Sequence, residues 1–232
     1  MLTVDFKKLI VNPGDRVLDA GCGFGRHSLE CLMKGADVFS MDLDLESLRK
    51  TRFSLFQIRN EYKKMNPFLV HSGDALKLPY KDASFDAIIC SEVMEHVSDD
   101  SLACQELVRV LKKNGKIAIT VPTYFSEVLY DMLSYEYFST PGGHIRKYLP
   151  KKLCRIMSNS GLEIYAIGHK HSFHTIWWII RCVVGLHRDK HPITRGYHIF
   201  LKKMLFSPIM RRVESFFDYF FPKSLVVYAW KR

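Results

Sequence analysis

A glycine-rich turn with an acid in front of it is the first stretch that could do chemistry. In RVLDAGCGFGRHSLE, residues 16–30, three glycines alternate behind Asp19. Glycine lets a ligand approach the backbone closely. The stretch is no Walker loop, since Gly-x-x-x-x-Gly-Lys does not occur, and a dinucleotide fingerprint would need glycine where Arg26 stands. An acid here would also repel a pyrophosphate, so the turn favours a cationic ligand.

S-adenosylmethionine is a ligand of that kind, because it carries an ammonium and a sulfonium. Two acids further along agree with it. Asp42 ends a predicted strand 17 residues after Gly25, where a carboxylate can accept both ribose hydroxyls. Asp74 and Ala75 follow the next predicted strand, where a carboxylate can accept from the adenine amino group. The acids therefore predict a site for S-adenosylmethionine at the ends of neighbouring strands.

Histidines supply the candidates for acid–base chemistry. His96 lies in SEVMEHV, directly after Glu95. His144 follows two glycines in PGGHIRKY, and Arg146 and Lys147 after it could meet an acidic group of a substrate. Either imidazole could act as a base near neutral pH. The alternatives are that His96 lines the pocket or braces its loop, and that His144 belongs to a solvated basic loop.

A third group of histidines lies in HKHSFH, residues 169–174. Alternate spacing predicts that His169 and His171 share one face of a strand. This spacing is typical of a metal site, but no cysteine or acid lies nearby in the sequence. We therefore expect surface imidazoles here.

These residues need elements to position them, and the first 121 residues alternate strand and helix patterns. Alternation of this kind predicts a mainly parallel sheet with helices on both faces. Asp44 is the expected N-cap of the second helix. The predicted strands cover 16–20, 37–44, 67–75, 84–92, 116–122, 162–171 and 224–232, and the predicted helices cover 25–35, 44–64, 99–115, 124–138 and 151–161.

In these segments the chain resembles the class I S-adenosylmethionine-dependent methyltransferases, in particular their type 11 group. VLDAGCGFGRHSLE matches the first motif of that family, VFSMDLD the second, GDALKLPY the segment at the adenine, and FDAIICSEVMEHV the segment after the fourth strand. The resemblance implies an α/β, Rossmann-like fold with a seven-stranded, mostly parallel sheet, an antiparallel last strand and helices on both faces. It assigns these residues to the cofactor: Asp19, Ala20, Gly21, Cys22, Gly23, Asp42, Leu43, Asp74, Ala75 and Ser91.

The resemblance also bears on catalysis. Glu-x-x-Glu-His, here Glu92, Glu95 and His96, looks like the matching stretch of ubiquinone-pathway O-methyltransferases, where it is linked in some members to a divalent metal. The same string occurs in relatives without a metal, so a divalent cation is the less favoured alternative. Methyl transfer is an in-line displacement that mainly needs alignment and a desolvated site. The residues expected to take part in catalysis are His96, Glu95 and His144.

Length and composition favour one domain. The 232 residues are 47% hydrophobic, enough for one good core. We expect a single methyltransferase domain over 1–232, with the S-adenosylmethionine-binding core at 11–121 and the substrate side, including an insert, at 122–224. Six cysteines without a Cys-x-x-Cys pair, no signal peptide and no apolar run of transmembrane length indicate a cytoplasmic protein.

Positive charge is concentrated near the end of the sequence. The net charge is +10, and residues 172–232 hold 11 Lys or Arg against 3 Asp or Glu. Residues 172–224 mix basic and aromatic side chains, including Trp177 and Trp178, as helices at a membrane surface do. The alternative is that the aromatics cover the sheet and the substrate pocket. Both interpretations favour a small-molecule or lipid-like substrate, and the first adds peripheral contact with an anionic membrane.

Two other functions stay open. The basic tail also suits an RNA methyltransferase, but no RNA-binding module flanks the core and no Asn-Pro-Pro-Tyr motif follows the fourth strand, so nucleic acid is the less favoured partner. A non-catalytic module that binds S-adenosylmethionine is the other alternative. The intact acids at 19, 42 and 74 argue against it.

Overall fold

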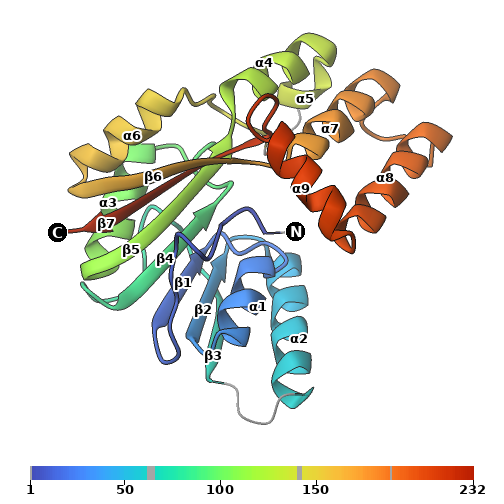
Figure 1. The fold of residues 1–232 in the computed structure, drawn as a ribbon. Helices are drawn as coiled ribbons and strands as arrows, with labels where there is room; N and C mark the ends of the chain where they lie inside the picture. The colour runs from blue at the N-terminus through green and yellow to red at the C-terminus, as the bar shows by residue number, and fades with distance from the viewer. Residues whose placement is uncertain (1, 62–65, 140–142, 189) are drawn as a thin grey trace.

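The computed structural model describes residues 2–61, 66–139, 143–188 and 190–232. A seven-stranded sheet runs through it in the order β3-β2-β1-β4-β5-β7-β6 (Figure 1). Strand β7 is antiparallel to β5 and β6, whereas the other pairs are parallel. The strands are β1 (Arg16–Ala20), β2 (Asp37–Asp42), β3 (Phe68–Ser72), β4 (Phe85–Ser91), β5 (Leu111–Pro122), β6 (Leu162–Lys170) and β7 (Ser224–Lys231). The predicted fold class is confirmed.

Helices cover both faces of the sheet. One face packs on α1, α2 and the first residues of the chain, and the other on α3 and α6. Beyond one end of the sheet, α7, α8 and α9 pack on one another (Figure 1). The helices are α1 (Arg26–Met33), α2 (Leu45–Glu61), α3 (Asp100–Val110), α4 (Tyr124–Leu133), α5 (Glu136–Ser139), α6 (Pro150–Asn159), α7 (Ser172–Val184), α8 (Pro192–Leu205) and α9 (Pro208–Phe217).

Two predicted helices end earlier than the sequence pattern indicated. The helix expected over 99–115 stops at Val110, because Leu111 turns extended and pairs with Phe85 as the start of β5. The lysines after Leu111 do not lie at a helix C-terminus as expected, and Lys112 binds Asp86 at 2.7 Å. The helix expected over 124–138 breaks at Ser134, which is also extended.

Candidate active site

The turn between β1 and α1 is built on glycines for a steric reason. Gly21 has a φ of 73°, and a Cβ there would lie 2.1 Å from Cγ2 of Val93. Gly23 has a φ of 49°, and a Cβ there would meet no heavy atom within 4 Å. The first glycine therefore lets the turn pack against the segment after β4, while the second presents bare backbone to open space.

Asp42, at the end of β2, holds this turn in place. Its Oδ2 accepts a hydrogen bond from the Gly23 N–H at 2.8 Å, and its Oδ1 accepts from the Asp44 N–H at 2.9 Å. The Thr51 hydroxyl donates to the Gly23 carbonyl at 2.7 Å. Each carboxylate oxygen keeps a further lone pair for a ribose hydroxyl. Asp44 also accepts from the Ser47 N–H at 3.0 Å, as expected of an N-cap.

Asp19 lies beneath the turn and is buried. Its Oδ2 accepts hydrogen bonds from the Ser28 N–H and hydroxyl at 3.0 and 2.6 Å. Burial raises the pKa of Asp19 to about 6, and these hydrogen bonds and the charge of Arg26 offset the effect only in part. Its Oδ1 has no hydrogen-bond partner in the described parts of the chain. A buried carboxylate with one unpaired oxygen fits a cationic ligand above it.

A cavity of about 680 Å³ opens over the turn. Eight of the ten predicted cofactor residues line it, whereas Asp19 and Ala20 are buried below. The predicted residues in its wall are Gly21, Cys22, Gly23, Asp42, Leu43, Asp74, Ala75 and Ser91. Glycine backbone, a carboxylate from each of two strand ends and apolar side chains are the surroundings that a sulfonium nucleoside needs, so the residues fit S-adenosylmethionine.

Glu92 borders the cavity in a left-handed conformation, with a φ of 58°. Its carboxylate accepts from Nζ of Lys223 at 2.6 Å and from the Thr120 hydroxyl at 3.0 Å. Burial opposes ionisation of Glu92, but the Lys223 ammonium and its hydrogen bond outweigh burial and hold the pKa below its usual value. The sequence analysis missed Lys223, since nothing in its local pattern indicates a partner 131 residues away.

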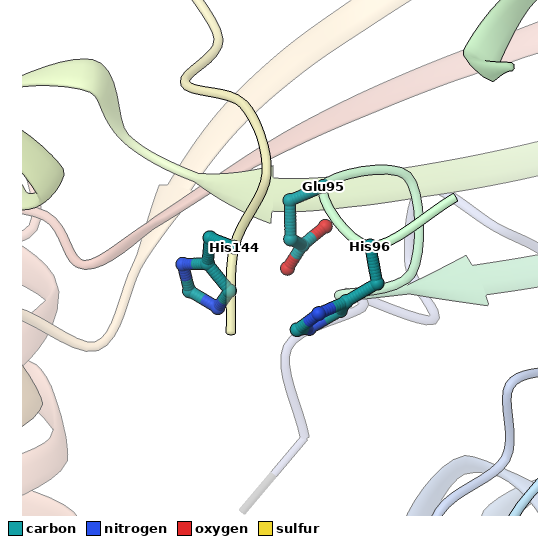
Figure 2. A group of neighbouring side chains, drawn as sticks. All are labelled: Glu95, His96 and His144. Atoms are coloured by element: carbon teal, nitrogen blue, oxygen red, sulfur yellow. The ribbon is translucent and has the colours of Figure 1, made fainter. Parts of the chain in front are cut away.

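The three predicted catalytic residues come together beside this cavity. Figure 2 shows Glu95, His96 and His144 around a common space. One donor atom of each lies within 4.8 Å of the others. The His96 and His144 rings meet edge to face with centroids 4.8 Å apart, and the Ile145 N–H donates to the Glu95 carbonyl at 3.0 Å. The loop before α6 thus packs on the segment after β4.

Glu95 is fully buried within this group. Burial raises its pKa well above the usual value, and the neighbouring Glu92 carboxylate adds to the effect. Neither carboxyl oxygen has a hydrogen-bond partner among the residues that the structure describes. The surroundings of Glu95 therefore favour the protonated, neutral form of its carboxyl group.

His144 is oriented by an acid that the sequence analysis did not single out. Oε2 of Glu127, on α4, lies 2.6 Å from Nδ1 of His144. The Tyr137 hydroxyl donates to the other oxygen of Glu127 at 3.1 Å, and Glu127 is buried. The helix YFSEVLYDML holds two acids, Glu127 and Asp131, and nothing in the sequence distinguishes the buried one from the exposed one. A buried carboxylate that faces one imidazole nitrogen fixes the tautomer and the orientation of the ring.

Other predicted features occupy places that differ from expectation. Arg146 binds Asp100 at 3.0 Å and Lys147 binds Asp131 at 2.7 Å, so both are engaged within the protein. Trp178 packs between tyrosines of α4 and α5, namely Tyr130 and Tyr137.

The expectation that the histidines of HKHSFH lie on the surface was partly wrong. His169 is exposed, but His171 is buried. They do not share a strand face, since β6 ends at Lys170 and His171 has a φ of 72°. The acid that is absent from the sequence around these histidines is Glu214 of α9, which lies close to His171 and His174.

Comparison with known proteins agrees with this geometry. A family model described as "Methyltransferase domain" matches residues 18–119. These residues span β1 to most of β5 and hold the cofactor turn, Asp42, Asp74 and the catalytic candidates after β4. Residues 18–119 of the chain therefore form a methyltransferase domain, and the resemblance seen in the sequence is confirmed for these residues.

Two curated relatives come from quinone pathways. The demethylmenaquinone methyltransferase of Streptomyces avermitilis is 35% identical over 114 residues, which cover 49% of this chain and 45% of that protein. The ubiquinone biosynthesis O-methyltransferase of Aromatoleum aromaticum is 29% identical over 157 residues, which cover 65% of this chain and 64% of that protein. The matches thus span less than two thirds of these relatives' length.

Solved structures share the fold at low identity. An S-adenosylmethionine-dependent methyltransferase from Methanosarcina mazei superposes with a TM-score of 0.65 at 18% identity, covering 100% of this chain and 99% of that one. The [4+2]-cyclase SpnF superposes with a TM-score of 0.64 at 19% identity, covering 97% and 77%. Since a protein named as a cyclase has this fold, the reaction must be argued from the site.

Proposed function

We propose that this chain transfers a methyl group from S-adenosylmethionine to a hydroxyl of a hydrophobic, quinone-like or lipid-like small molecule. The observation that carries the proposal is the pair of half-buried His144 and buried Glu127, because the His144 ring packs against His96 in the wall of the cofactor cavity. An oxygen acceptor needs a base, and an imidazole backed by a carboxylate is one. The two quinone-pathway relatives support the acceptor class.

The cofactor would lie across the turn after β1. The Gly21–Gly23 backbone would contact the methionine part, with the Asp19 charge below its ammonium. Asp42 would accept from the ribose hydroxyls, and Asp74 and Ala75 would flank the adenine. S-adenosylmethionine supplies an electrophilic methyl group on sulfur. The protein's part is to align that methyl with the acceptor and to exclude water.

His144 would take the proton from the acceptor hydroxyl. The Glu127 carboxylate would stabilise the imidazolium that results, because Glu127 is buried and its Oε2 lies 2.6 Å from Nδ1 of His144. Tyr137 keeps Glu127 in place through its hydrogen bond. His96 and neutral Glu95 form the remaining wall on this side.

A divalent cation is the second candidate for activating the acceptor. Glu95, His96 and His144 could supply two imidazoles and one carboxylate to it. A cation would have to displace the proton of Glu95, whose pKa is raised by burial. His144 is therefore assigned first as the base. Activity in the presence of a chelator distinguishes this role from that of a metal ligand.

The test is methyl transfer from labelled S-adenosylmethionine to a membrane-lipid extract, with total RNA beside it. His144→Ala and Glu127→Gln should each lower turnover by about 100-fold or more, and S-adenosylhomocysteine should bind both as it binds the parent. The exposed His169→Ala is the matched control and should keep full turnover. Label in RNA alone would refute the acceptor class. Full turnover of His144→Ala would refute the base, and loss of turnover in chelator would favour the cation.

An exposed apolar face on α9 supports a lipid-like acceptor. On α9, Ile209 is 72% and Phe216 64% exposed, and Val213 between them and Phe220 just after the helix are exposed too. The adjacent Arg211 and Arg212 are exposed and basic. Apolar side chains flanked by arginines are complementary to an anionic lipid surface. Within the described residues, no helix is long and apolar enough to cross a membrane.

Vesicle binding tests this contact. The double variant Phe216→Ser with Phe220→Ser should weaken co-sedimentation with anionic vesicles by about tenfold or more. Both aromatic side chains that would insert into the bilayer surface are then replaced by polar ones. Phe53→Ser with Phe56→Ser, two exposed residues on α2, is the control and should change nothing. The membrane contact would be refuted if both double variants bound the vesicles equally well, or if the parent protein did not bind them.

A further inference from the structure

Helix α9 directs its acid inward. Glu214 is 4% exposed, whereas Ile209 and Phe216 of the same helix lie on the surface. Burying a carboxyl group while exposing apolar side chains costs free energy on both counts. The arrangement is favourable only when the buried carboxyl group has a partner that stabilises it.

Two histidines face Glu214. His171 is the residue before α7, and His174 lies in its first turn. One donor atom from each of the three residues lies within 4.8 Å of the others. Nδ1 of His171, Nδ1 of His174 and Oε1 of Glu214 are buried and have no hydrogen-bond partner in the described chain. Three unpaired polar atoms at one place are unusual, because buried polar groups are nearly always hydrogen-bonded.

We propose that His171, His174 and Glu214 form a binding site for a divalent transition-metal ion such as Zn²⁺. Two imidazole nitrogens and one carboxylate oxygen are a common ligand set for zinc, and a fourth position stays open for water or another donor. The site is separate from the cofactor turn and from the Glu95–His96–His144 group. It lies in the segment that the family model does not match.

Thr3 supplies the outer support that metal-binding histidines usually have. Its hydroxyl lies 3.0 Å from Nε2 of His171. In the tautomer with the proton on Nε2, this N–H donates a hydrogen bond to the Thr3 hydroxyl, and Nδ1 keeps a lone pair for a metal ion. Partners of this kind fix the tautomer and the ring orientation of a ligand. The same residue's N–H lies 3.2 Å from Nε2 of His27, which lines the cofactor cavity.

The electrostatics agree with the ligand forms. Burial lowers the pKa of His174 to about 4 and that of His171 well below its usual value, so both imidazoles are neutral at pH 7. Burial, reinforced by Asp218, raises the pKa of Glu214 to about 7. The charges of Lys223 and Arg26 oppose a cation. Glu214 and Asp218 offset them once Glu214 loses its proton to the metal.

A bound ion would connect three parts of the chain. It would join α9 to the start of α7 and, through Thr3, to the first residues of the chain. Because those residues reach His27 in the cavity wall, we infer a structural ion that holds the α7–α9 unit against the cofactor site.

The experiment uses Zn²⁺ alone and the full chain. His96→Ala removes one ligand of the other histidine group, so it serves as the background. We expect this protein, stripped with chelator, to bind one Zn²⁺ per chain by titration and elemental analysis, and Co²⁺ to give visible absorption typical of nitrogen ligands. Adding His174→Ala or the isosteric Glu214→Gln should abolish both signals. Thr3→Val should weaken affinity by about 10–100-fold.

His169→Ala in the same background is the control, since His169 lies in the same sequence motif but is exposed. It should keep the metal. Circular dichroism of every variant shows whether the fold is retained. Failure of the His96→Ala protein to bind Zn²⁺, or equal binding by folded His174→Ala and Glu214→Gln variants, would overturn the site. Neither readout depends on methyl transfer, so failure here leaves the proposed function untouched.

Discussion

Cofactor binding should depend on pH through Asp19. The pKa of this buried carboxyl is raised to about 6 by burial in the ligand-free protein. A cofactor with an ammonium group favours the ionised form, so binding must first remove the proton at low pH. Each pH unit below the pKa then costs about 1.4 kcal/mol, or about tenfold in affinity. We expect S-adenosylhomocysteine, which keeps the ammonium, to bind about tenfold more weakly at about pH 5 than at about pH 7.5.

The stability of the protein should respond in the opposite sense. The folded pKa of Asp19 lies above the unfolded value of 3.8, so the folded state holds the proton more tightly. The resulting destabilisation is absent below about pH 4, grows as pH rises to about 6 and is complete above that. Asp19→Asn removes it and should raise the free energy of unfolding at pH 7 by up to about 3 kcal/mol.

Calorimetric titration at several pH values measures the first effect, and urea denaturation the second. Other groups also titrate between about pH 5 and 7.5, and Asp19→Asn isolates the part due to Asp19. The variant should bind weakly and with a flat pH profile. Equal affinity of the parent at both pH values, or the same pH dependence in parent and variant, would refute this account of the buried acid.

Three further tests, which use four substitutions, examine the geometry in and around the site. Asp42→Ala should weaken cofactor binding by about 2–4 kcal/mol, measured by calorimetry, because a charged acceptor for two hydroxyls is lost; an unchanged affinity would contradict the ribose assignment. Gly21→Ala should lower the melting temperature more than Gly23→Ala, since only the first Cβ collides with Val93; the reverse order would contradict the packing. Tyr148→Phe removes the one hydroxyl that faces two acceptors, the Met94 carbonyl and Asp100, and should lower the free energy of unfolding in urea denaturation by about 1–3 kcal/mol; an unchanged free energy would contradict a stabilising role for this hydroxyl.

The cofactor half of the site could be predicted from the sequence because its signals are local. Alternating glycines, an acid at the end of each strand and short apolar runs are each set by a few neighbouring residues. Parallel strands bring their carboxyl ends to one edge, so Asp42 and Asp74 had to meet there. The errors within this half are at element ends, as at Leu111, where tertiary pairing outweighs a helical pattern.

The substrate half could not be predicted in the same way, because its contacts join distant segments. Glu127 lies 17 positions from His144 and Glu92 lies 131 from Lys223. Each looks like an ordinary charge in its own helix or loop. Glu214 is the strongest example, since it sits in a helix whose pattern gives no sign that its acid faces inward.

The position of β7 has a consequence for how the chain folds during synthesis. Strand β7 fills the sheet between β5 and β6, although residues 123–223 separate it from β5. Until β7 leaves the ribosome, β5 has an unpaired edge and β6 lacks the strand with which it pairs, a state prone to aggregation. Lys223, the residue before β7, also completes the partners of Glu92. The chain therefore completes the Glu92–Lys223 ion pair beside the candidate site in the same late step that protects its sheet.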